Sequence, residues 1–543
     1  MLRRMLISTS IPFECKHRNS IVHSRKPPIV AMARLSATLS AMLRVVQRIG
    51  RRDGANDFVH RNMELRRRQH TVGYQAIGSF HSEDVDELMN QIDNVYNPPE
   101  LPFEPRKSHI SSLDSNRDFS KDFLLDLESF TFLNHGAFGA ALRTSYGRAE
   151  QWRYHLERQP LRYFDRDLLP HLVYSARRLA AFCGADRSSL TLIQNVTSGL
   201  NTILKGYSKQ YKDQAHVVLW DTTYGSLKKI SRRYCDKVTE IPVSDYFHLF
   251  DDGASDDVFQ QALLDLISSS STSGADLKNA LLILDHTTSN TALNMNLKAL
   301  SLIAKDHGML TMVDGAHALL AQDVNLKSME NIDFFVANGH KWLSCPRGIG
   351  VLHCPHHELR ETVLNEPAVM SHGVGDGYQS AYLWDGCRDY SAALSVPAAL
   401  DYWESLGTQL VQRRIRCMLE DAVRLLGSMW HPSEFDNGVT KTIPVGVTLA
   451  PLSIHAPMMT LVRLPQGLQK RDTNGGIMGT KAVATSEDAK RIQDFLYDNQ
   501  IEVPIKCIRG ALYARISCHI YNEISDYERL GSTLLFDTSS VVK

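Results

Sequence analysis

Two periods of hydrophobic spacing alternate along the middle of the chain. Short, continuously apolar segments such as 216–221 (HVVLWD) and 279–287 (NALLILDHT) are typical of strands buried on both faces. Each precedes a segment with apolar residues at helical spacing, as in 224–234 and 296–308. The same alternation predicts strands over 189–195, 309–314 and 332–338 and a helix over 198–211. This order predicts an α/β fold with a mainly parallel sheet flanked by helices.

The pattern changes after about Ser391. Long helical stretches over 392–429 are followed by predicted strands near 442–449, 458–464 and 511–517, a helix at 486–499 and a last helix. We therefore expect a large domain over 119–391 and a smaller α+β domain over 392–543.

The residues before the large domain have a different character. Residues 53–118 combine one helical stretch with the proline-rich segment 97–105 (NPPELPFEP), which predicts a linker or arm that is partly disordered. In residues 1–52 the only acid is Glu14, and apolar residues recur at helical spacing among many arginines. Such a basic leader is typical of a transit peptide. The alternatives are a disordered basic tail or a working start at Met32; the pattern slightly favours the transit peptide, and mitochondrial and cytoplasmic locations both stay open.

Composition limits the classes of function. The chain has 543 residues, 43% hydrophobic and 22% charged, as expected of a globular protein with more than one domain. The formal net charge is zero, so no global basic surface is available for nucleic acid or an anionic membrane. No apolar run is long enough to cross a bilayer. The nine cysteines form no CxxC pair and no zinc spacing, which favours reduced thiols and predicts no metal site.

Polar residues stand where several predicted strands end: Asn195, Asp221, Asp285, Asp314 and segment 338–341. Any single one is explained by the turn chemistry of Asn and Asp. Because ligands of open parallel sheets bind at the carboxyl ends of the strands, several at one edge predict a shared cleft.

Lys341 lies in the apolar segment 338–346 (NGHKWLSCP). A lysine in such surroundings is usually paired or chemically used, and burial favours the neutral amine that can bond a carbonyl carbon. A buried acid on the neighbouring strand, Asp314, suits pyridoxal phosphate (PLP), because it keeps the pyridine nitrogen protonated. Spacing alone does not separate this reading from a salt bridge between Lys341 and Asp314.

The turn 195–199 (NVTSG) leads directly into a predicted helix. Free N–H groups at a helix N-terminus bind phosphate. Thr197 and Ser198 also suit an ordinary helix cap, and this turn alone favours the cap.

Residues 313–343 resemble the PLP segment of the class V aminotransferases, a branch of the fold-type I PLP-dependent enzymes. The similarity is greatest to members that resemble isopenicillin N epimerase and hercynylcysteine sulfoxide lyase. Similar motifs follow in order at 132–140 (FLNHGAFGA), 156–168 (LERQPLRYFDRDL), 195–201 (NVTSGLN), 221–229 (DTTYGSLKK), 388–400 (RDYSAALSVPAAL) and 513–522 (YARISCHIYN). The resemblance runs from about Phe119 to the end of the chain.

The resemblance implies a role for each matched residue. Lys341 matches the lysine that holds PLP as a Schiff base, Asp314 matches the acid at the pyridine nitrogen, and His317 lies beside the cofactor. The other matches are Thr197, Ser198 and His340 for phosphate, Tyr224 over the ring, Arg515 for the substrate carboxylate, and Asn134 and His135 near the substrate. Outside the motif, Tyr224 would be an ordinary helix-start residue and Arg515 a surface ion-pair partner.

Two departures from the family pattern affect the expected chemistry. Cys387 stands where the family often has a threonine that reaches the phosphate of the partner subunit, and a thiol is a poor substitute for that hydroxyl. The loop-like segment 471–488 contains no cysteine, so the persulfide mechanism of cysteine desulfurases is not expected. Cys345 is interpreted as a packing residue.

The predicted function is a PLP-dependent enzyme that acts at Cα and Cβ of an amino acid, with a C–S lyase (β-elimination) favoured. The alternative activities are those of an amino-acid epimerase or an aminotransferase. The alternative without enzymatic activity is a catalytically inactive scaffold with a PLP-enzyme fold. The expected partners are a small amino-acid substrate and a second copy of the chain, with no nucleic acid and no membrane.

Overall fold

The computed structural model describes residues 85–106, 117–251, 256–272, 277–435, 443–468 and 483–536. The predicted leader (1–52), the first part of the predicted arm and most of the cysteine-free segment 471–488 lie outside them. All described residues belong to one compact unit, Tyr74–Lys543. The helices within these ranges include none that is both long and apolar enough to span a membrane.

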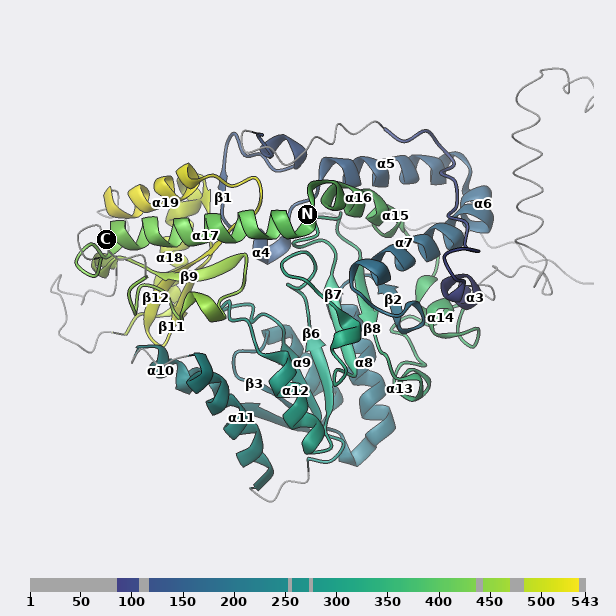
Figure 1. Ribbon diagram of the computed structural model, residues 1–543, viewed down its shortest axis with the longest axis horizontal. Helices are drawn as coiled ribbons and strands as arrows, with labels where there is room; N and C mark the ends of the chain where they lie inside the picture. The colour runs from purple at the N-terminus through teal and green to yellow at the C-terminus, as the bar shows by residue number, and fades with distance from the viewer. Residues whose placement is uncertain are drawn as a thin grey trace, which may run out of the picture. The chain divides into compact units, whose positions relative to one another are not determined.

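A seven-stranded sheet with the strand order β2-β8-β7-β6-β5-β3-β4 forms the centre of this unit (Figure 1). Its strands are β2 (Leu190–Ile193), β3 (His216–Trp220), β4 (Lys237–Ile241), β5 (Leu281–Asp285), β6 (Leu310–Asp314), β7 (Phe334–Asn338) and β8 (Gly350–His353). Neighbours from β4 to β7 are parallel, whereas β8 is antiparallel to β7 and β2. The predicted α/β class with a mainly parallel sheet is confirmed. The exception, β8, follows β7 through residues 339–349, which contain no crossover helix of the kind that parallel neighbours need.

Both faces of the sheet are buried. Leu281 and Ile283 of β5 join the core beneath α8 (Val196–Tyr211), whereas Leu282 and Leu284 join the core that contains α12 (Leu297–Asp306). Alternate side chains of one strand therefore enter two different cores, which explains why the strand appears in the sequence as an uninterrupted apolar run.

The helices before Ser391 surround this sheet. In chain order they are α3 (Val85–Asn90), α4 (His135–Phe138), α5 (Arg143–Arg158), α6 (Pro160–Arg162), α7 (Leu168–Phe182), α8, α9 (Gly225–Tyr234), α10 (His248–Asp251), α11 (Asp256–Thr272), α12, α13 (His357–Thr362) and α14 (Tyr378–Leu383). A π-helical turn over Tyr163–Asp167 joins α6 to α7.

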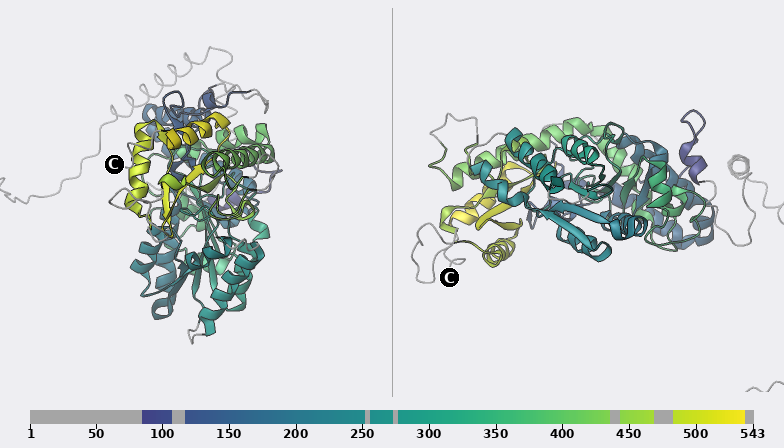
Figure 2. Two further views of the ribbon diagram at one scale, coloured as in Figure 1. Left: turned by 90° about the vertical axis from the view of Figure 1, so that its left-hand side faces the viewer. Right: turned by 90° about the horizontal axis from the view of Figure 1, so that it is seen from below.

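The C-terminal part contains a second, antiparallel sheet with the order β11-β12-β9. Its elements are α15 (Ser391–Leu394), α16 (Val396–Leu406), α17 (Thr408–Trp430), β9 (Met459–Arg463), α18 (Ser486–Asp498), β11 (Ile505–Ile508), β12 (Ala511–Ser517) and α19 (Ile524–Phe536). Figure 2 shows the yellow and green C-terminal elements above the teal central sheet in its left-hand view. The boundary at residue 391 stays a prediction, since both sheets belong to the same compact unit.

One predicted strand of this part is wrong. Residues 443–449 form turns with a single bridge between Thr448 and Val462 instead of the strand expected near 442–449. Pro444 lacks a backbone donor and Gly446 has φ of 84°, so both interrupt an extended ladder.

A short strand pair links two distant parts of the chain. β1 (Thr131–Phe132) pairs in parallel with β10 (Ile501–Glu502), and the Ser517 N–H of β12 donates to the Leu133 carbonyl. These bonds place the motif at 132–140 beside the sheet that carries Arg515.

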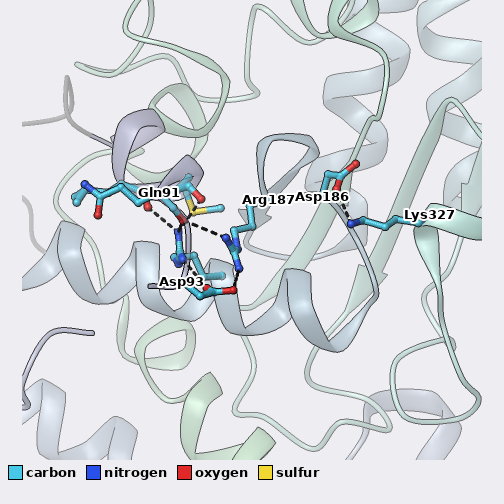
Figure 3. Close-up of polar contacts among 8 residues, drawn as sticks. Gln91, Asp93, Asp186, Arg187 and Lys327 are labelled. Atoms are coloured by element: carbon cyan, nitrogen blue, oxygen red, sulfur yellow. Dashed lines mark hydrogen bonds and ion pairs between the residues drawn. The ribbon is translucent and has the colours of Figure 1, made fainter. Parts of the chain in front are cut away.

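The described part of the predicted arm is bonded to the main body. Arg177 of α7 pairs with Asp93 at 2.9 Å and donates to the carbonyl of Gln91 at 2.8 Å. Arg187 donates to the same carbonyl at 3.1 Å and binds the same carboxylate (Figure 3). Asp86 accepts bonds from two backbone N–H groups of α14. Residues 85–93 are thereby fixed on α7 and α14.

Candidate active site

Polar residues from separate strands meet at the carboxyl edge of the central sheet, as the sequence predicts. Asp285 and Asp314 lie opposite each other in the register of β5 and β6. The Val196 N–H donates to Asn338 Oδ1 at 3.0 Å, which joins the start of α8 to the end of β7. Asp221 accepts a bond from the Ser244 N–H at 3.2 Å, so its carboxylate is engaged by the segment that follows β4.

Lys341 follows β7 at this edge and is partly buried. Its Nζ lies 3.1 Å from Nε2 of His317. Burial lowers the pKa of Lys341 to about 8, Asp314 opposes this change, and Arg515 adds to it. A substantial fraction of the amine is therefore neutral near physiological pH, which a nucleophilic lysine requires.

Asp314 ends β6 and is 6% exposed. Its Oδ1 accepts a bond from the Ala316 N–H at 2.9 Å, and no residue in the described ranges donates to Oδ2. Burial raises the pKa of Asp314, while the Ala316 bond and the charge of Lys341 oppose that rise. The salt bridge between Lys341 and Asp314 considered above is not among the ion pairs of the described residues, so one carboxylate oxygen remains available.

Asp285 is a second buried acid at the same edge, and sequence reasoning gave it no role beyond a corner. Thr223 Oγ1 donates to its Oδ2 at 2.6 Å. Burial raises the pKa of Asp285 to about 7, with a further contribution from the charge of Asp314. The available signal was an acid directly after the continuously apolar run 280–284.

Arg515 reaches the site from β12 of the second sheet and is 3% exposed. Its Nη1 donates to the Ser289 carbonyl and its Nη2 to Asn134 Oδ1 at 3.3 Å. Its Nε is buried and has no partner among the described residues. Burial lowers the pKa of Arg515 to about 10. The surface ion-pair alternative is wrong, because this guanidinium is buried and pairs with no described carboxylate.

Asn134 stands between two charged residues. Its amide oxygen accepts the bond from Arg515, and its Nδ2 donates to Glu502 Oε1 at 3.3 Å. Asn134, which lies just after β1 in the β1–β10 strand pair, therefore orients Arg515.

The start of α8 combines a helix cap with one unused hydroxyl. Ser198 forms a capping box with Asn195: its N–H donates to Asn195 Oδ1 at 3.0 Å, and its Oγ accepts from the Asn195 N–H at 3.3 Å. The cap interpretation therefore holds for Ser198. Thr197 is exposed, and its hydroxyl has no bond to a described residue. His340 Nδ1 is buried without a partner in the described part of the chain, and burial lowers the pKa of His340 to about 4.

Tyr224, Cys387 and Cys345 differ in their exposure. Tyr224 caps α9 at the same edge, is 47% exposed, and stacks on no other described ring. Cys387 is exposed. Cys345, in contrast, is buried, and burial raises the pKa of its thiol to about 12, in accord with a packing residue.

His135 is held by buried contacts, and its expected position near the substrate stays a prediction. It is fully buried behind Lys341, with Nε2 3.1 Å from the Lys341 carbonyl oxygen and Nδ1 2.9 Å from the Tyr521 hydroxyl. The reason is the close approach of its motif to the lysine turn. Gly139 has φ of 67°, and a Cβ there would lie 1.9 Å from the His340 carbonyl oxygen.

The available groups fit PLP. Lys341 offers an amine for its carbonyl carbon, and Asp314 offers a free carboxylate oxygen for its pyridine nitrogen. Thr197 at a helix N-terminus and the unpartnered His340 Nδ1 offer polar atoms for its phosphate. The part of the chain that the structure describes contains no cluster of His, Cys, Asp or Glu suited to a metal ion.

Comparisons with known proteins agree with this assignment. The aminotransferase class-V family model matches residues 171–437, about half of the chain. L-cysteine desulfhydrase from Arabidopsis thaliana is 24% identical over 460 residues, covering 79% of this chain and 92% of that protein. Isopenicillin N epimerase from Amycolatopsis lactamdurans is 27% identical over 425 residues, covering 74% of this chain and 94% of that protein.

A solved structure shows the same fold. The apo cysteine desulfurase from Thermococcus onnurineus NA1 is similar with a TM-score of 0.57 at 18% identity, covering 79% of this chain and 100% of that one. The fold-type I architecture and the family expected from the sequence motifs are thus confirmed. The chain belongs to the class V aminotransferase family and is a PLP-dependent enzyme.

Proposed function

We propose that the protein is a C–S lyase that cleaves a cysteine-type amino acid by β-elimination. The observation that carries this proposal is that Asp314 of the central sheet and the buried Arg515 of the second sheet both lie close enough to Lys341 to affect its charge. The similarity to a protein named L-cysteine desulfhydrase supports the choice of a cysteine-type substrate. PLP, when bound, supplies the electron sink that makes the Cα proton of an amino acid removable.

Arg515 binds the substrate α-carboxylate in this proposal. Its two Nη groups each make one bond, to Ser289 and to Asn134, and its Nε–H has no partner among the described residues, so donors remain for the carboxylate. A charge-assisted bond in such a buried site is strong and directional. Because Asn134 also holds Arg515 from its other side, the amino acid is oriented by a fixed guanidinium.

Lys341 is the group that moves the Cα proton. Its pKa of about 8 lies close to physiological pH, as an effective general base requires. His317 contacts the same Nζ at 3.1 Å. Loss of the sulfur substituent from Cβ releases a thiol or sulfide, and hydrolysis of the released 2-aminoacrylate gives pyruvate and ammonia.

The sulfur leaves as a free product rather than as an enzyme persulfide. Segment 471–488 contains no cysteine that could accept it. Cys345 is a buried thiol whose raised pKa disfavours the nucleophilic thiolate.

The test is product analysis with purified full-length protein and PLP. L-cysteine and a series of S-substituted cysteines are supplied, and pyruvate, ammonia and released thiol are measured. We expect the three products in equal amounts, and none from Lys341→Ala.

The alternatives give different products. Exchange of the Cα proton with deuterium from solvent, without pyruvate, would indicate an epimerase and contradict the proposal. Amino transfer that needs an added keto acid would indicate an aminotransferase. Protein that binds PLP without any of these reactions would be a scaffold.

A further inference from the structure

Trp342, Lys341 and His317 form a continuous buried contact. The indole Nε1 of Trp342, which is 1% exposed, donates to Nδ1 of His317 at 3.3 Å. Nε2 of the same imidazole lies 3.1 Å from Nζ of Lys341. Two consecutive residues of the chain therefore contact the two nitrogens of one ring.

These two contacts determine where the protons are. An indole N–H can only donate, so Nδ1 of His317 accepts and carries no proton. A neutral imidazole then carries its proton on Nε2 and donates it there. An ammonium group has no lone pair to accept such a bond, whereas a neutral amine has one. Both contacts exist together only when Lys341 is a neutral amine.

The surrounding charges favour the same state. The pKa of His317 lies well below its usual value, mainly because of burial. The charges of Lys341, Arg515, His286 and His135 lower it further, in that order. For Lys341, burial and Arg515 favour the neutral amine, and Asp314 alone opposes it. His317, His340 and His135 also interact with the charge of Lys341, and burial lowers the pKa of all three, which keeps them neutral.

We propose that Trp342 is a positioning residue that holds His317 as the Nε2–H tautomer and so keeps Lys341 as a neutral amine, ready to bond the carbonyl of PLP. This rests on the role of Lys341 in the proposed function. Without the indole donor, His317 can carry its proton on Nδ1 and accept a bond from the Lys341 ammonium at Nε2. That arrangement stabilises the charged amine.

The matched variants are Trp342→Phe and Trp403→Phe. The first keeps an aromatic ring but removes the donor to His317. The second removes another buried indole, whose Nε1 donates to the neighbouring Leu343 carbonyl at 2.9 Å, without touching His317. Both are studied as full-length chain from which PLP has been removed.

The first measurement is the pH dependence of Lys341 acetylation by dilute acetic anhydride, with peptide mapping. Wild type and Trp403→Phe should titrate near pH 8. In Trp342→Phe the midpoint should rise by about one pH unit or more, so that the rate at pH 7 falls roughly tenfold. An unchanged midpoint in folded Trp342→Phe would overturn the proposal.

The second measurement needs no variant. The ¹⁵N shifts of the His317 ring, assigned by comparison with His317→Gln, report its tautomer in the wild-type chain. We expect the Nε2–H form, and an Nδ1–H form would overturn the proposal even if Trp342→Phe fails to fold. Neither measurement uses lyase activity, so a negative product assay would refute the proposed function and leave this result standing.

Discussion

At the scale of single residues, two carboxyl groups at the ends of neighbouring strands have different surroundings. Asp314 keeps one oxygen without a described donor, whereas Asp285 is bonded by Thr223. The motif match predicts that Asp314 is the acid for the pyridine nitrogen, and that Asp285 is a neighbour whose pKa the charge of Asp314 raises further. The two residues can be changed separately.

Asp314→Asn should leave PLP bound while removing most of its electron-sink effect. The amide cannot hold a proton on the pyridine nitrogen, so the chemical step should slow roughly a thousandfold or more. The absorbance of bound PLP and kcat for pyruvate release are measured on the same sample. Near-native turnover would show that this acid is structural.

Asp285 should make the protein less stable as the pH rises from about 4 to about 7. Its folded pKa of about 7 is raised, so in this interval the folded state holds a proton that the unfolded state has lost. Asp285→Asn should remove this slope and stabilise the protein at pH 8 by about 2 kcal/mol or more. The urea unfolding midpoints of wild type and Asp285→Asn are measured at pH 5 and at pH 8. The prediction is wrong if the difference between the midpoints at the two pH values is the same in both proteins.

Sequence reasoning was most informative for residues with a distinctive local motif. Lys341, Asp314 and Arg515 each lie in a segment that resembles the family and meet in the structure. Trp342 and His135 could not be placed in the same way, because their roles depend on which distant atoms reach them. A sequence of one chain does not show that the Trp342 indole meets His317.

At the scale of elements, strands buried on both faces were predictable and those defined by pairing were not. β5 and β7 are continuously apolar, which signals double burial. β4 is a half-exposed edge strand with the sequence KVTEI. Its polar residues interrupt the apolar run by which a buried strand is recognised in the sequence. β1 and β10 contain two residues each, so only their mutual pairing makes them strands.

Gly139 should be essential to the turn that carries Lys341. A methyl group there meets the His340 carbonyl at 1.9 Å, and φ of 67° is strained for any other residue. Gly139→Ala should lower stability by about 2 kcal/mol or more and weaken PLP binding, because backbone atoms cannot move aside. The matched control is Gly467→Ala, where no atom lies within 4 Å of the added methyl. Equal melting temperatures for the two variants would contradict this.

At the scale of the whole molecule, we predict a homodimer with a shared active site. The family resemblance implies an active site at a dimer interface, and zero net charge offers no repulsion to association. Light scattering on the full-length protein tests the state. A fully active monomer would contradict it.

Cys387 gives this prediction a second test. It is exposed, and the family resemblance implies a hydroxyl at this position that contacts the partner's phosphate. Cys387→Thr should therefore bind PLP more tightly, measured by equilibrium titration, while Cys417→Thr, at another exposed cysteine, should not. Unchanged affinity would remove the proposed role of this position.

The most direct test of the whole account is to locate the cofactor. Purified protein with PLP is reduced with borohydride, which fixes the pyridoxyl group on the nitrogen that holds it, and the peptides are mapped. We predict a single modified residue, Lys341. A pyridoxyl group on another lysine, or on none, would contradict the central claim that this chain is a PLP-dependent enzyme built around Lys341.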